Sequence, residues 1–138
     1  MNYIAEIKCK NGMPYVGFMN RAHCSTNCAL HDYKNQPSIY AFPITGNYVD
    51  LLTKALKSKN DSGLHLLQFM GVKNSIKHLK NAILTLQKDE SYDSYTDEEE
   101  SNYFNSTPKN VINALTHLKE MAEECVDKTC IWEIKETL

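Results

Sequence analysis

The sequence lacks the glycine-rich and nucleophile motifs by which many enzymes are recognised. Its five glycines never cluster, so it has no loop of the kind that cradles phosphates. It also contains no Gly-x-Ser-x-Gly, no His-Glu-x-x-His and no acidic metal-binding loop. These absences weaken an enzymatic interpretation without excluding it. We therefore expect a protein that acts by binding and needs no cofactor.

Long apolar runs are also missing, because none approaches the ~20 residues of a membrane span. The first ten residues, MNYIAEIKCK, alternate and contain Glu6, unlike a secretory signal. We therefore expect a cytoplasmic protein that does not bind membranes. There are five cysteines, and their odd number in a reducing location predicts free thiols.

Size and charge indicate one domain with two opposed blocks of charge. A chain of 138 residues, 42% of them hydrophobic, fits a single domain over 1–138 that folds without a metal or disulfide. Residues 54–88 contain seven lysines and one acid. Residues 89–105, DESYDSYTDEEESNYFN, contain seven acids and no Lys or Arg; we name them the acidic segment. Blocks of one sign often mark interaction surfaces.

Alternating and short apolar runs predict the strands, which are residues 2–10, 13–19, 38–44 and 129–136. Asn11-Gly12 predicts a type I′ turn between the first two strands, since that turn needs positive φ at both central residues. Pro14 cannot donate a ladder hydrogen bond, so the second strand is expected at a sheet edge. Residues 20–37 are expected to form a loop. The last strand is expected to pair with the N-terminal hairpin.

Apolar residues at helical spacing predict the helices, which are residues 47–59, 63–70, 73–88 and 108–126. We expect Asn47 to cap the first helix, and Thr107 and Pro108 to begin the last. The strands are not separated by single crossover helices, which disfavours a doubly wound parallel sheet. The predicted fold class is therefore α+β, with a small, mostly antiparallel sheet (the N-terminal hairpin plus the C-terminal strand) packed against three to four helices.

The acidic segment is the main candidate for function. Internal loops longer than ~12–15 residues are usually functional or disordered. High like charge favours a solvated loop, but such a loop has no need of aromatic side chains. Aromatic residues supply contact area at the centres of interfaces. The predicted partner-binding residues are Tyr92, Asp93, Tyr95, Asp97, Glu98, Glu99, Glu100 and Tyr103.

Carboxylates interleaved with tyrosines resemble a phosphate-mimicking surface that plugs a cationic, nucleic-acid-binding cleft. Charge complementarity at such a surface raises association rate and specificity. In its size, its lack of motifs and its acidic aromatic loop, the chain is similar in type to toxin-immunity and phage anti-defence proteins. That similarity implies a non-enzymatic inhibitor that neutralises a basic partner protein, such as a nuclease toxin.

A first alternative is nucleic-acid binding by a lysine stripe. Lys73, Lys77 and Lys80 recur at i, i+4 and i+7 on a predicted helix and could contact phosphates. Against this, the chain has one arginine, Arg21, the residue type preferred for bidentate phosphate contacts. The stripe could equally dock the acidic segment within the same molecule.

A second alternative is a small zinc-binding domain or enzyme. His23, Cys24, Cys28 and His31 offer four zinc ligands within nine residues. Structural zinc sites usually draw two pairs from separated segments, and no Cys-x-x-Cys is present here. The exposed face of the last strand and the edge strand near Pro14 could each mediate a homodimer.

Overall fold

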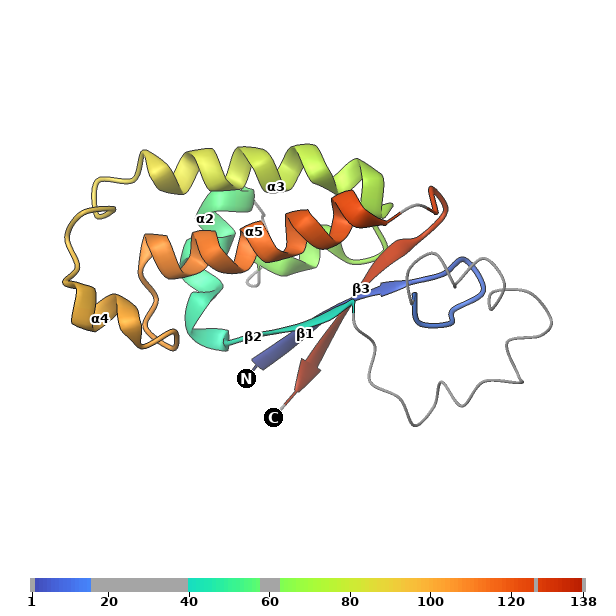
Figure 1. The fold of residues 1–138 in the computed structure, drawn as a ribbon, viewed down its shortest axis with the longest axis horizontal. Coiled ribbons are helices and arrows are strands. Elements are labelled where there is room, and N and C mark those ends of the chain that lie inside the picture. Colours follow the sequence, from blue (N-terminus) through green and yellow to red (C-terminus); the bar gives the residue numbers. More distant parts are fainter. Residues whose placement is uncertain (1, 16–39, 58–62, 126, 138) are drawn as a thin grey trace.

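The computed structural model describes residues 2–15, 40–57, 63–125 and 127–137. Within these ranges three strands form one antiparallel sheet, in the order β2-β1-β3 (Figure 1). The strands are β1 (Asn2–Lys8), β2 (Ala41–Ile44) and β3 (Ile131–Thr137). The α-helices are α2 (Val49–Leu56), α3 (Val72–Gln87), α4 (Asp97–Ser101) and α5 (Pro108–Glu124), and the 3-10 helices are η3 (Gly46–Tyr48) and η4 (Gly63–Leu67). The predicted α+β class is confirmed.

The register of the sheet places its apolar residues on the face that meets the helices. Ala5 pairs with Phe42 of β2 and with Ile134 of β3, and its alternating neighbours are buried with it. The indole Nε1 of Trp132 donates to Ser75 Oγ on α3 at 2.7 Å, which fixes the sheet to that helix. The alternation predicted for the first and last strands, and their pairing, are both confirmed.

Helices α3 and α5 lie side by side and run in opposite directions (Figure 1). Leucines at helical spacing on both helices are fully buried between them and the sheet. Thr107 caps α5 by accepting a hydrogen bond from Asn110 N at 3.2 Å, and Pro108 is the first helical residue. The predicted start of this helix is therefore confirmed.

The turn at Asn11-Gly12 differs from the predicted type. Gly12 has a φ of 84°, whereas Asn11 does not have positive φ. Gly12 N donates to Cys9 O at 2.9 Å, and Cys9 N donates to Met13 O at 2.7 Å. This pattern is a three-residue hairpin loop, in which only the last residue needs positive φ. The described part of the return strand meets β1 through one bridge, between Lys8 and Pro14, and residues 16–19 lie outside the described residues.

The predicted cap at Asn47 is wrong. Thr45 accepts the hydrogen bond from Asn47 N at 3.3 Å, so the chain enters a 3-10 turn before α2 begins at Val49. The side chain of Asn47 is thereby free to donate to Phe104 O at 2.9 Å. Asn47 anchors a distant segment instead of capping its own helix.

The segment predicted as a helix over 63–70 is a 3-10 helix over Gly63–Leu67. Gly63 packs against the backbone of α2, where a Cβ atom would lie 2.3 Å from the carbonyl carbon of Leu52. Phe69 then takes a positive φ of 62° and donates its N–H to Trp132 O. This left-handed residue turns the chain onto the edge of β3 and ends the short helix.

Candidate functional site

The acidic segment is folded onto one end of the helical layer. It contains α4, which lies at the end of the molecule where α3 stops and α5 starts (Figure 1). The structure therefore places a short helix where the sequence indicated a loop. A helix of five residues is not stable by itself, so other contacts must hold it.

Asp89 forms the first anchor of the acidic segment. One carboxylate oxygen accepts from the Ser91 N–H at 2.9 Å and from its hydroxyl at 2.6 Å. The other accepts from Lys54 Nζ on α2 at 2.5 Å, and the Asp89 side chain is only 3% exposed. The hydrogen bond from Lys54, followed by those from Ser91, holds the pKa of Asp89 well below its usual value. This carboxylate is engaged within the fold.

A capping box fixes the start of α4. Thr96 Oγ1 accepts from Glu99 N at 3.1 Å, and Glu99 Oε1 accepts from Thr96 N at 3.0 Å. The Asn105 side chain donates to Glu99 O at 2.8 Å and ties the end of the segment back to the helix. Thr-x-x-Glu is a readable helix-start pattern, so this helix could have been found in the sequence.

Three side chains outside the acidic segment donate to its backbone carbonyls. These hydrogen bonds are Asn47 Nδ2 to Phe104 O (2.9 Å), Tyr48 Oη to Tyr103 O, and Asn110 Nδ2 to Asn102 O (3.2 Å) and Asn105 O (3.0 Å). Asn110 is buried on α5, so its amide is held in place by the surrounding core. The end of the segment is thus bound to both η3 and α5.

Lys109 lies under the middle of the acidic segment. Its amine is 5.0 Å from the centre of the Tyr92 ring, a cation–π distance. The same amine is 3.9 Å from Asp93 Oδ1 and 3.8 Å from Glu100 Oε1. The Glu100 side chain is 13% exposed, so Lys109 offsets a charge that is largely withdrawn from water.

Three further acids and two aromatic rings of the segment face outward. The Asp93 side chain is 88% exposed, and Asp97 and Glu98 are exposed on α4. Tyr103 and Phe104 are 63% and 47% exposed, and their ring centroids are 4.2 Å apart. We name these five residues the acidic platform. It combines exposed carboxylates, of which Asp93 also lies 3.9 Å from the Lys109 amine, with an exposed aromatic pair on an ordered backbone.

The predicted partner-binding residues therefore separate into two groups. Those that are exposed are Asp93, Asp97, Glu98, Glu99 and Tyr103, and those that are half-buried are Tyr92, Tyr95 and Glu100. The prediction missed Phe104 as a site residue, although it adjoins Tyr103. It also missed Lys109 and Lys54, and the contact of Lys54 with Asp89 joins residues 35 positions apart.

The lysine stripe is only partly available to a ligand. Lys73 Nζ donates to Ala122 O and Glu123 O, both at 3.1 Å, where it binds the last turn of α5. Lys77 and Lys80 are exposed on α3. The lysines that contact the acidic segment in the described structure lie outside this stripe.

The predicted zinc ligands His23, Cys24, Cys28 and His31 lie outside the described residues. The expectation that all cysteines are free thiols is wrong for Cys9, which is disulfide-bonded. An odd number of cysteines leaves one unpaired but does not prevent the others from pairing. Cys125 and Cys130 are buried free thiols, and the hydrogen bond from Cys130 lowers the pKa of Cys125 to about 7.

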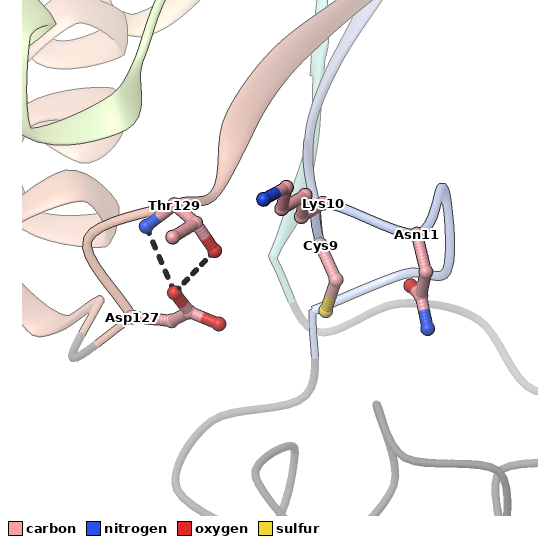
Figure 2. A pocket seen from close by; sticks show the side chains of 5 residues that line it. All are labelled: Cys9, Lys10, Asn11, Asp127 and Thr129. Atoms are coloured by element: carbon pink, nitrogen blue, oxygen red, sulfur yellow. Dashed lines mark hydrogen bonds between the residues drawn. The ribbon is translucent and has the colours of Figure 1, made fainter.

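A pocket of about 440 Å³ lies at the end of the sheet beside Cys9. Figure 2 shows the side chains that line it. Asp127 lines it, but one of its carboxylate oxygens accepts from Thr129 N at 2.8 Å and from Thr129 Oγ1 at 2.6 Å. Lys10 and Asn11 complete the lining. The Asp127 carboxylate thus closes a turn, and the described lining offers no nucleophile paired with a base.

No family model, no curated protein and no solved structure matches this chain. Within the described ranges, no helix is both long and apolar enough to traverse a bilayer. The same ranges contain no group of three or more His, Cys, Asp or Glu side chains placed to hold a metal ion. Inference about function therefore rests on the surface of the molecule.

Proposed function

We propose that this protein is a non-enzymatic inhibitor that binds a basic partner protein through the acidic platform. The observation that supports this proposal is that the acidic segment contains two kinds of polar group, those that anchor it to the fold and those that are exposed. Some of its polar groups hold the segment on the fold, and this leaves Asp93, Asp97 and Glu98 exposed beside two exposed rings.

An ordered platform has a thermodynamic advantage over a free loop. A disordered segment pays an ordering cost on binding, which lowers its affinity for a given area. The contacts from α2, η3 and α5 order the segment when the chain folds, so this entropy is not lost again on binding. Exposed carboxylates beside aromatic rings then suit a partner surface rich in Lys and Arg, because the charges steer association and the rings supply buried area.

The partner chemistry that fits best is a cationic cleft that normally holds nucleic acid. Such a cleft presents several cations at phosphate spacing, and a nuclease toxin is one member of the class. Neutralisation of a toxin or of a host defence protein, as in toxin-immunity and phage anti-defence systems, is the role that we propose. Cytoplasmic location belongs to the same proposal, since the targets would be there.

Affinity capture from the source organism's lysate tests the proposal. The bait carries Asp93→Lys, Asp97→Lys and Glu98→Lys, which leaves Asp89, Glu99 and Glu100 in place to hold the segment. A matched control carries Asp50→Lys, Glu123→Lys and Glu136→Lys, the same change of charge at exposed positions elsewhere. Lysates are treated with nuclease, and captured proteins are quantified by mass spectrometry.

We expect at least one basic protein to be captured by the unchanged chain and the control but lost from the platform variant. Its association with the unchanged chain should slow as salt is raised, because salt screens the steering charges. Capture of the same proteins by the platform variant and the control would contradict the proposal.

A further inference from the structure

Two hollows adjoin along α5, beside the platform. The larger, of about 470 Å³, lies between β2 and α5 and is bounded at one side by Tyr103 of the platform. The smaller, of about 210 Å³, continues toward the end of α5. His117 lines both hollows, so they form one surface, which we name the α5–β2 groove.

The larger hollow is an aromatic pocket. Phe42 and His117 form one wall, with ring centroids 4.1 Å apart and planes inclined by 19°. Tyr48, Tyr103 and the exposed Asn113 line it further. Flat rings with a few polar groups at the edge suit a large apolar or aromatic side chain.

The smaller hollow is acidic. Glu120 and Glu124 are four residues apart on α5, and both are exposed. Burial and the adjacent Glu124 charge raise the pKa of Tyr40, which also lines this hollow. Neither carboxylate forms an ion pair with a described residue, and no Lys or Arg is among the described residues that line the two hollows. A cationic side chain would therefore be complementary to this end of the groove.

We propose that the α5–β2 groove binds a short extended segment of the partner, with one large apolar side chain in the larger hollow and a Lys or Arg in the smaller. This inference rests on the proposed function, and it identifies a second contact on the same partner. The groove begins at Tyr103, so a basic protein seated on the platform has the groove within reach.

The spacing of the two hollows sets the spacing of the partner's side chains. The α5 residues that line the larger hollow run from Asn110 to His117, and those that line the smaller run from His117 to Glu124. Corresponding positions are therefore seven residues apart, a helical rise of about 10 Å. An extended chain advances ~3.3 Å per residue, so about three residues separate the two anchors. A segment with its cation three residues from its apolar anchor should bind better than one with twice that separation.

The test uses the full chain and a panel of fluorescein-labelled nine-residue peptides. The first peptide has a tryptophan and, three residues away, a pair of arginines. In matched peptides the tryptophan is replaced by glycine, the arginines are replaced by glutamates, or the separation is doubled. Binding is measured by fluorescence anisotropy and mapped by backbone amide shifts in NMR spectra of the labelled protein.

We expect the first peptide to shift the amide signals of Asn113, His117 and Glu120. Its affinity should be at least about tenfold higher than that of each matched peptide. The variant Glu120→Lys/Glu124→Lys should lose this binding, whereas the platform variant should keep most of it. The dispersed spectra of the variants verify that they remain folded.

Two results would contradict the proposal that the α5–β2 groove binds a segment of the partner. Amide shifts confined to residues 93–104 would do so while supporting the platform, because the peptide would then bind there alone. No binding by any peptide below about 1 mM would also overturn it, and the platform would still be judged by its own capture experiment.

Discussion

The acidic segment and the lysine stripe of α3 are both blocks of like charge, but the fold engages them differently. In the acidic segment, Asp89, Glu99 and Glu100 form contacts within the chain, and three other acids point outward beside exposed rings. In the stripe, Lys73 binds the end of α5. The exposed Lys77 and Lys80 remain, without aromatic partners in the described contacts.

This difference shows that a run of charge does not by itself identify a binding surface. Charges that are buried in ion pairs or used as caps within the fold are unavailable to a partner, whereas Asp93 keeps 88% of its side chain exposed beside Lys109. What distinguishes the acidic segment is that its free charges lie on an anchored backbone next to exposed aromatic side chains.

The largest effect is expected for Asn110→Ala. The buried amide makes two hydrogen bonds to the acidic segment, and their loss should lower the free energy of unfolding by about 2 kcal/mol. Hydrogen exchange within 96–105 should accelerate at the same time. The exposed neighbour Asn113, replaced by Ala, is the control and should change neither quantity. Equal stability of the two variants in urea would refute this anchor.

A smaller effect is expected within the lysine stripe. Lys73→Met removes two hydrogen bonds to the last carbonyls of α5 and a favourable charge at the helix end. We expect it to lower the free energy of unfolding by about 1 kcal/mol. Lys77→Met, on the same face, should stay within about 0.5 kcal/mol of the parent. A reversed order in urea titrations would show that Lys73 is not structural.

Thr96→Ala should act on α4 while leaving the rest of the domain in place. Loss of the cap costs about 1 kcal/mol of local helix stability. The amide of Glu99 should then exchange faster in NMR experiments, whereas the midpoint of global unfolding should move little. Ser94→Ala is the control, since the Ser94 hydroxyl makes no hydrogen bond with a described residue. Unchanged exchange at Glu99 would contradict the capping box.

The smallest effect concerns the pH dependence contributed by Asp89. Its pKa is lowered in the folded state, so its contribution to stability is present above the unfolded value of about 3.9. That contribution is lost as pH falls through the lower, folded-state pKa. Asp89→Asn should therefore destabilise the protein at pH 7, and the gap to the parent should narrow below about pH 4. A constant gap in thermal melts between pH 7 and pH 2.5 would disprove this assignment.

Much of the fold could be predicted because its signals are local. Alternation identified β1 and β3, and Thr107-Pro108 identified the start of α5. The type I′ turn predicted at Asn11-Gly12 was wrong, because that dipeptide fits more than one hairpin loop. The role of Asn47 was missed because its partner carbonyl belongs to Phe104, 57 residues away.

The acidic segment could be located from its composition, but the residues of the acidic platform could not be identified in this way. Which acids are free depends on Lys54 and Lys109, and Lys54 meets Asp89 across 35 residues of sequence. The α5–β2 groove depends on the stacking of Phe42 against His117, which is likewise a contact between distant segments. Patterns along the chain do not encode such pairings.

Hydrogen exchange of the acidic segment in the free protein tests the central claim most directly. If the segment is an ordered platform, the amides of Glu99, Glu100 and Asn105, which donate within it, should exchange at least about tenfold more slowly than in an unstructured chain. The amides of Asp97 and Glu98, which begin α4 and have no acceptor within the helix, serve as internal comparisons in the same spectrum. Exchange of all of these amides at unstructured rates would contradict the account, because the charges and rings would then have no fixed arrangement.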